Sequence, residues 1–196
     1  MLREKRRIAF FGGTFDPFHS GHLEMARAAR DHLRLQRVYF VPAQQNPHKD
    51  QGPQVSNPQR IEMIRLGTHG EPSFEIWDGE LDRDGPSYTL HSIQHIERVY
   101  PNSHLFWIIG YDQLPGLANW YGIETLVQKI GFILVRRPGY ELTWPSIPGL
   151  TVYPVDNPMI NVSATEIRQR AFNGETLKGM VPLDVESYIL KNGLYR

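Results

Sequence analysis

The chain has 196 residues, of which 40% are hydrophobic and 21% charged, and its 21 basic side chains balance its 21 acidic ones. This ordinary composition argues against a disordered or fibrous chain, and zero net charge provides no broad basic field for nucleic acid or an anionic membrane surface. The absence of cysteine excludes disulfide frameworks, zinc ribbons, iron–sulfur clusters and a thiol nucleophile. No apolar run approaches the roughly 20 residues of a membrane span, so we expect a cytoplasmic protein.

Short apolar runs typical of strands alternate with helical patterns along the chain. We expect strands at 8–11, 38–41, 74–77, 105–109, 132–135 and 150–155, several of them apolar nearly throughout. We expect helices at 23–35, 58–66, 89–99, 123–129, 165–172 and 185–190, the second of them capped by Asn57 with proline at its first position. This alternation predicts an α/β fold, a Rossmann-like doubly wound parallel sheet that binds ligands at the carboxyl ends of its strands.

The segment from Pro42 to Pro58 is rich in proline and nearly free of apolar side chains. A stretch of this length and composition predicts a mobile loop, and long loops in compact proteins often have a function. Because the chain length suits a single hydrophobic core, we expect one domain over residues 1–196 that carries this loop at about 42–58.

The sequence GGTFDPFHSGHL joins the first expected strand to the first helix and has the properties of a phosphate site. Gly12 and Gly13 allow backbone amides to approach a ligand, and the helix that begins near Gly21 offers unpaired N–H groups. His19 and His22 lie three residues apart, so both can donate hydrogen bonds in one direction. The sequence contains neither a Walker loop nor a Gly-x-Gly fingerprint, and the alternatives are a metal site or an ordinary glycine turn.

A second motif, VSATEIR, opens the helix expected at 165–172. Ser163 and Glu166 have the spacing of a capping box, which alone would account for both residues. Arg168 is not needed for a cap, and it can bring a guanidinium to the end of the helix that binds anions. Taken by itself, the motif leaves a helix cap and a phosphate site equally open.

Both motifs resemble the signatures of the adenylyltransferases of the nucleotidyltransferase α/β fold, in particular the bacterial nicotinate-nucleotide adenylyltransferases. The resemblance implies transfer of the adenylyl group of ATP to nicotinate mononucleotide, with the two motifs meeting around one triphosphate. It also implies that His19, His22 and Arg168 are catalytic. The residues that it places around ATP come from three segments: Gly12, Gly13, Thr14, Phe15, Gly110, Asp112, Ser163, Thr165 and Arg168.

The middle of the chain distinguishes the acceptor, because phosphopantetheine adenylyltransferase shares both end motifs. The stretches VPAQQNPHK, RDGPSYTLHSI and IIGYDQLPGLANWY resemble the nicotinate-nucleotide enzymes, although Asn46 and His91 depart from the family pattern. Trp120 offers a flat surface on which a pyridine ring can stack, and the resemblance implies that the backbone N–H groups of Thr89 and Tyr121 bind the pyridine carboxylate. Three basic side chains complete the expected acceptor-binding set: His48, Lys49 and Arg137.

These residue types suit a direct in-line displacement. A phosphate oxygen that attacks the α-phosphorus of ATP needs positioning and charge stabilisation rather than an enzyme nucleophile or a strong base. We therefore expect no enzyme-bound intermediate, no metal ligands from the protein, and Mg²⁺ held mainly by phosphates and water. The alternatives are transfer to nicotinamide mononucleotide or phosphopantetheine, and a non-catalytic nucleotide sensor.

Overall fold

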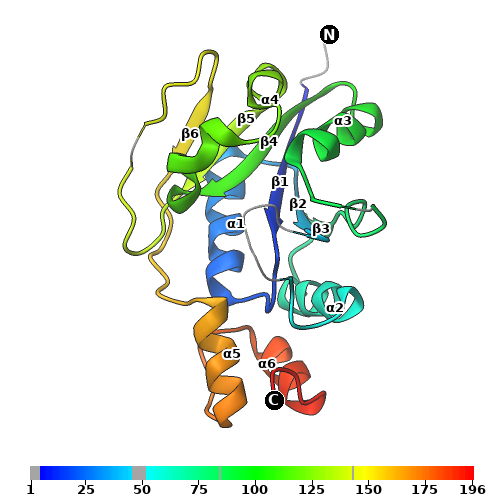
Figure 1. Ribbon diagram of the computed structural model, residues 1–196, viewed down its shortest axis with the longest axis vertical. Coiled ribbons are helices and arrows are strands. Elements are labelled where there is room, and N and C mark those ends of the chain that lie inside the picture. Colours follow the sequence, from blue (N-terminus) through cyan, green and yellow to red (C-terminus); the bar gives the residue numbers. More distant parts are fainter. Residues whose placement is uncertain (1–4, 46–51, 84, 143) are drawn as a thin grey trace.

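A computed structural model describes residues 5–45, 52–83, 85–142 and 144–196 of the chain. Within these ranges the chain forms a six-stranded parallel sheet with the order β3-β2-β1-β4-β5-β6 (Figure 1). The strands are β1 (Arg6–Gly13), β2 (Arg37–Pro42), β3 (Phe74–Ile76), β4 (Ser103–Gly110), β5 (Gly131–Val135) and β6 (Val152–Val155). The predicted doubly wound parallel sheet is confirmed, and the winding changes direction between β1 and β4.

The helices lie close to their predicted positions. They are α1 (Ser20–Leu33), α2 (Asn57–Gly67), α3 (Thr89–Val99), α4 (Ile123–Lys129), α5 (Ala164–Asn173) and α6 (Leu183–Lys191). A 3₁₀ segment, η1 (Tyr111–Asn119), follows β4 and was not predicted, because its internal proline and glycine are poor indicators of a helix. Helix α1 begins earlier than predicted because His19 caps it.

The side chains of β1 alternate between the two faces of the sheet. Ala9 and Phe11 pack in a core with residues of α1, α2, α5 and α6, whereas Ile8 and Phe10 pack in a second core with residues of α3, η1 and α4. Because helices cover both faces, the central strands are apolar nearly throughout, as the sequence indicated.

The late helices α5 and α6 lie at the end of the molecule where β1 ends and α1 begins (Figure 1). The Ser20 N–H at the start of α1 donates a hydrogen bond to the Met180 carbonyl at 2.9 Å. The last part of the chain is therefore joined directly to the loop that carries the first motif.

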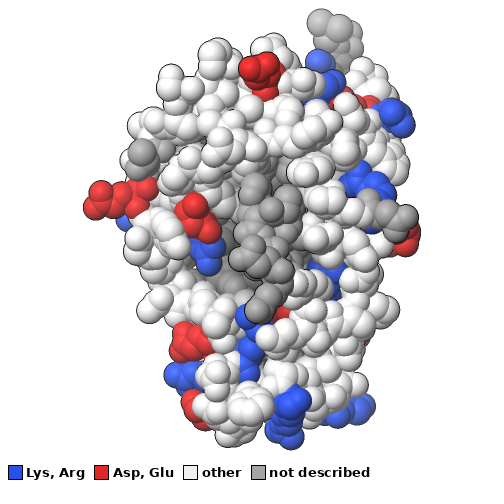
Figure 2. Space-filling model, in the orientation of Figure 1, with Lys and Arg blue, Asp and Glu red and all other residues white. Residues whose placement is uncertain are grey.

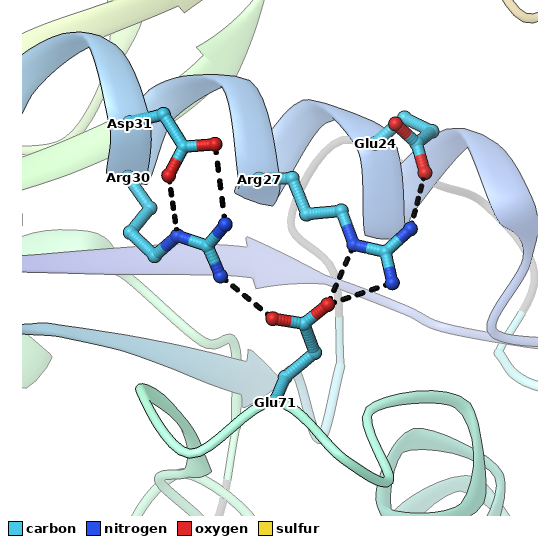
Figure 3. Close-up of polar contacts among 5 residues, drawn as sticks. All are labelled: Glu24, Arg27, Arg30, Asp31 and Glu71. Atoms are coloured by element: carbon cyan, nitrogen blue, oxygen red, sulfur yellow. Dashed lines mark hydrogen bonds and ion pairs between the residues drawn. The ribbon is translucent and has the colours of Figure 1, made fainter.

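The outer face of α1 is joined to the turn that precedes β3 by a group of ion pairs, which we call the Glu71 cluster (Figure 3). Glu71 accepts hydrogen bonds from Arg27 at 2.7 Å and from Arg30 at 2.6 Å, and Glu24 and Asp31 pair with the same two arginines. Burial alone would raise the pKa of Glu71, but the bonds from Arg27 and Arg30 outweigh it and hold the pKa below its usual value.

The cap of α2 differs from the prediction. Ser56, and not Asn57, is the N-cap, and its N–H donates to Gln59 Oε1 at 2.9 Å. The Asn57 side chain instead donates to Gln44 at 2.5 Å and accepts from Arg60 at 2.6 Å. Asn57 therefore joins the helix to the end of β2 rather than capping it.

The surface in Figure 2 carries charges of both signs. On this face the described acidic and basic side chains are interspersed among uncharged residues. Within the described ranges, the helices are too short or too polar to cross a membrane.

Candidate active site

Two cavities open at the carboxyl ends of the strands, where the winding of the sheet changes direction. The first, of about 580 Å³, we call the histidine cavity; it is bounded by the β1–α1 loop, the end of β4 and the start of α5. It is lined by the two predicted catalytic histidines, His19 and His22, and by every residue of the predicted ATP-binding set: Gly12, Gly13, Thr14, Phe15, Gly110, Asp112, Ser163, Thr165 and Arg168. The expected meeting of His22 and Arg168 around one cavity is confirmed.

The second cavity, of about 510 Å³, we call the tryptophan cavity. Thr89, Trp120 and Tyr121 line it, as predicted for the acceptor side. Gly12 and Gly13 line both cavities, so the two share a wall at the end of β1. Two ligands, one in each cavity, would meet across these two glycines.

None of the three basic side chains predicted to bind the acceptor is among the described residues that line the tryptophan cavity. Arg137 lines the histidine cavity rather than the tryptophan cavity. His48 and Lys49 lie outside the described residues.

The two histidines of the first motif cap the helix together. His22 N–H donates to His19 Nδ1 and His19 N–H donates to His22 Nδ1, both at 3.3 Å. Their rings stack with centroids 3.5 Å apart. Because each Nδ1 accepts a hydrogen bond, the proton of each neutral ring lies on Nε2, which makes Nε2–H a donor.

His19 is only 4% exposed, and its surroundings disfavour the imidazolium form. Burial, and to a lesser degree the nearby Arg137 cation, lower the pKa of His19 from 6.5 to about 3. His19 is therefore neutral near pH 7. His22 packs edge-on against Phe15, with ring centroids 4.9 Å apart, so an aromatic contact also fixes its ring.

Arg168 joins the two motifs. Its Nη1 donates to the Asp16 carbonyl at 2.7 Å, and its Nη2 donates to Thr165 Oγ1 at 3.3 Å. Ser163 caps α5, because its Oγ accepts from Glu166 N–H at 3.1 Å. The other half of the expected capping box is replaced by a pair between the Glu166 carboxylate and Arg170 at 3.3 Å. Ser163 is thus both a helix cap and part of the cavity lining.

Asp112 and Arg137 form an ion pair at 2.7 Å beside the end of β4. Asp112 Oδ1 is buried without a hydrogen-bond partner among the described residues. A Cβ at Gly110 would collide with this oxygen and would approach Arg137 Cδ to 2.7 Å. Any side chain at position 110 would therefore displace this ion pair.

Aromatic side chains form much of the tryptophan cavity. Trp107, which is buried, lies directly behind Gly12, since a Cβ at Gly12 would approach its Cζ2 to 2.6 Å. Tyr121 is 54% exposed and packs against Tyr88 and His91, with ring centroids 4.8 and 5.4 Å away. His91, which departs from the family pattern, thus supports a residue of the predicted acceptor site.

Sequence reasoning missed Glu80, a buried carboxyl group that lines the tryptophan cavity. Ser92 Oγ donates to it, and Arg83 in turn donates to Ser92 Oγ at 2.8 Å. Burial raises the pKa of Glu80, and the bonds from Ser92 and Ser87 only partly oppose this. A single glutamate between two turns has no sequence pattern that would have identified it.

Gln113 was also missed, although it lines both cavities. Its position just after a strand of the parallel sheet is a usable signal, because ligands bind at such ends. Among the described residues, no three His, Asp or Glu side chains are grouped so that they could hold a metal ion.

Comparison of the sequence with known proteins identifies similar families and relatives. The model of the cytidylyltransferase-like family matches residues 10–170. The nicotinate-nucleotide adenylyltransferase of Bacillus subtilis (strain 168) is 38% identical over 193 residues, which cover 97% of this chain and 98% of that protein. The "Probable nicotinate-nucleotide adenylyltransferase" of Thermus thermophilus is 41% identical over 190 residues, covering 97% of this chain and all of its own length.

A solved structure extends the similarity to the fold. The nicotinic acid mononucleotide adenylyltransferase of Plasmodium falciparum, complexed with NaAD, superposes with a TM-score of 0.79 over 97% of each chain. Its sequence identity to this chain is 18%, so this likeness concerns the fold alone.

Proposed function

We infer the chemistry of the two cavities from one premise: the chain belongs to the cytidylyltransferase-like family and, within it, to the nicotinate-nucleotide adenylyltransferases. It transfers the adenylyl group of ATP to nicotinate mononucleotide, giving nicotinate adenine dinucleotide and pyrophosphate, in NAD biosynthesis. The observation that carries our assignment of the site is the wall of Gly12 and Gly13 shared by the two cavities.

The histidine cavity suits the triphosphate of ATP. His19 and His22 each offer an Nε2–H donor, and Arg168 offers a guanidinium at the start of α5. The N-terminus of α5 adds N–H groups and the positive end of its dipole. We assign His19, His22 and Arg168 to the phosphates because these groups donate hydrogen bonds, whereas ionised carboxylates would repel phosphate. Because hydrogen bonds already hold these side chains in place, they can stabilise negative charge that develops in the transition state without moving.

The tryptophan cavity suits the pyridine nucleotide. Trp120 offers a face for stacking, and Thr89 opens α3, so its N–H is one of the first-turn donors that lack an acceptor within the helix. Such a donor, together with the Tyr121 N–H, would bind the carboxylate of nicotinate better than an amide, whose NH₂ would face donors. His48 and Lys49 stay predictions for the acceptor phosphate.

The reaction follows from the shared wall. An oxygen of the acceptor phosphate attacks the α-phosphorus of ATP across Gly12 and Gly13, a new P–O bond forms, and the bond to pyrophosphate breaks. The enzyme contributes position and charge stabilisation and forms no covalent intermediate. Arg137 lines the cavity of the leaving group, where it would contact phosphate once its bond to Asp112 is shared.

The lining of the histidine cavity also bears on the metal. Its polar side chains are mostly cationic or neutral, and its two carboxylates already have partners: Asp112 Oδ2 is paired with Arg137, and Asp16 accepts from the Tyr195 hydroxyl and the Gln54 N–H. Mg²⁺ would therefore be held by the phosphates and water and would neutralise part of the phosphate charge.

The test is a Mg²⁺-dependent assay of pyrophosphate release from ATP with nicotinate mononucleotide, nicotinamide mononucleotide or phosphopantetheine as acceptor. We expect the highest kcat/KM with nicotinate mononucleotide. A higher kcat/KM with the amide would contradict the assignment of the carboxylate donors. Tight binding of ATP without turnover on any acceptor would instead indicate a nucleotide sensor.

A further inference from the structure

We propose that Tyr195 is a positioning residue for adenylyl transfer, because its hydroxyl holds the Asp16 carboxylate in the loop that carries both histidines. The inference rests on the function proposed for the histidine cavity. It concerns a residue outside the lining of both cavities, which acts on the site only through Asp16.

Tyr195 is turned toward the site by its own backbone. Its φ of 67° lies in the left-handed region, which residues other than glycine rarely adopt. The preceding Leu194 is buried, and its N–H donates to the Ile189 carbonyl of α6 at 3.0 Å. The tyrosine is therefore placed by a helix that packs in the core and not by a loose segment.

The Tyr195 hydroxyl donates to Asp16 Oδ1 at 2.8 Å. Burial, together with the nearby Asp16, raises the pKa of Tyr195, so the phenol stays protonated and stays a donor. A contact with Met63 Sδ at 3.9 Å completes the surroundings of the hydroxyl.

Asp16 is the point where four parts of the chain meet. It is 4% exposed, and its Oδ2 accepts from the Gln54 N–H at 2.7 Å. Gln54 belongs to the loop predicted at about 42–58, which also carries the acceptor-binding candidates His48 and Lys49. The Asp16 carbonyl accepts from Arg168 at 2.7 Å. Asp16 thus connects Tyr195 both to a catalytic candidate and to this loop.

The charges around Asp16 explain why a neutral donor matters. Arg60 is completely buried and donates to the Thr14 carbonyl of the same loop at 2.8 Å. Burial lowers the pKa of Arg60, and the attraction of the Asp16 charge opposes that shift. The Tyr195 hydroxyl gives Asp16 Oδ1 an uncharged donor, while Arg60 and Arg168 donate to the backbone carbonyls of the same loop.

The first test compares Tyr195→Phe with Tyr188→Phe. Tyr188 lies on α6 and packs against the same core, so its variant is a control for the loss of a partly buried hydroxyl in this region. We expect Tyr195→Phe to lower kcat roughly tenfold, with the KM of both substrates within about twofold of wild type. A lower Tm with an unchanged kcat, or an equal loss in Tyr188→Phe, would show a purely structural role and overturn the proposal.

A double-mutant cycle tests the path through Asp16. Asp16→Asn leaves one side-chain acceptor oxygen for two donors, the Tyr195 hydroxyl and the Gln54 N–H. If Tyr195 acts through Asp16, Tyr195→Phe should have little further effect on kcat in the Asp16→Asn background. Independent, multiplying effects would overturn this path.

Amide hydrogen exchange tests the positioning role of Tyr195 without relying on enzyme activity, so it can fail independently of the proposed function. By amide hydrogen exchange, the Gln54 N–H should exchange faster in Tyr195→Phe than in wild type, while in Tyr188→Phe it should not. Unchanged exchange at Gln54 together with unchanged kcat would refute the positioning role. An inactive wild type with the expected exchange pattern would refute the proposed function alone.

Discussion

Helix α1 has one polar cluster at its outer face and another at its start. Both contain arginines and carboxylates, but only in the first do these groups pair with one another. In the Glu71 cluster, Arg27 and Arg30 are bound to a carboxylate, so the charges largely cancel. At the start of the helix, Asp16 accepts hydrogen bonds from a hydroxyl and a backbone N–H. Arg168 donates only to uncharged oxygens among the described residues, the Asp16 carbonyl and Thr165 Oγ1. The positive charge of Arg168 is held in place but not neutralised, which leaves it for an anion.

The largest expected effect is on the reaction itself. His22→Ala removes an Nε2–H donor that we assign to the phosphates, and kcat should fall roughly 10²–10³-fold while the Kd for ATP changes far less. His32→Ala, on the same helix at an exposed position, is the matched control and should leave kcat unchanged. Steady-state kinetics and ATP titration measure both; equal losses in kcat and affinity would contradict a role in the transition state.

The second effect is on the free energy of unfolding, which should depend on pH over different ranges at the start of α1 and in the Glu71 cluster. Because folding lowers the pKa of His19 from 6.5 to about 3, the unfolded chain binds the extra proton, and stability falls as the pH drops below about 6.5. By pH 5 the loss should reach about 2 kcal/mol. The lowered pKa of Glu71 also removes stability on acidification, but only below its ordinary value of about 4.5.

His19→Asn isolates the histidine contribution, because asparagine keeps a side-chain oxygen for the helix cap without titrating. Urea unfolding at pH 7.5 and 5 should show wild type losing about 2 kcal/mol more than this variant. Parallel losses in the two proteins would mean that His19 is not the group responsible.

A smaller effect is expected for the guanidinium of Arg168. Lysine cannot donate to the Asp16 carbonyl and Thr165 Oγ1 in the same fixed geometry, so Arg168→Lys should lower kcat/KM about tenfold. Arg170→Lys, which alters exposed pairs with Glu166 and Glu175 on the same helix, should have no effect on kcat/KM. Comparable kinetics for the two variants would contradict the claim that Arg168, which pairs with no carboxylate among the described residues, acts on the reaction whereas Arg170 does not.

The smallest effect belongs to the Glu71 cluster. Its carboxylate is 15% exposed and its partners are more exposed, so Glu71→Gln should cost about 1 kcal/mol of unfolding free energy and leave kcat unchanged. Glu75→Gln breaks a more exposed pair with Arg37 and should cost less. A loss of activity in Glu71→Gln would mean that the two clusters are not independent.

The sequence predicted what depends on local pattern. The parallel sheet follows from apolar runs, and the histidine cavity follows from two motifs that carry glycines, histidines and an arginine at strand and helix ends. The stacked capping of His19 and His22 was not predicted, because histidine is not among the usual N-cap residues.

What the sequence could not provide are contacts between segments far apart in the chain. Tyr195 and Asp16 are 179 positions apart, and neither lies in a pattern that points to the other. Arg137 likewise follows β5, and only the folded sheet places it beside Asp112 after β4. Such pairs are set by how the strands and helices pack in the folded chain, and the spacing of residues in the sequence does not encode them.

The thin partition of Gly12 and Gly13 has a consequence for inhibition. A single molecule that carries a phosphate chain at one end and a pyridine ring at the other could occupy both cavities together, with its linker over the backbone of these glycines. Once one end is seated, the other is confined at a high effective concentration, so a linker of matched length should gain affinity without any new contact.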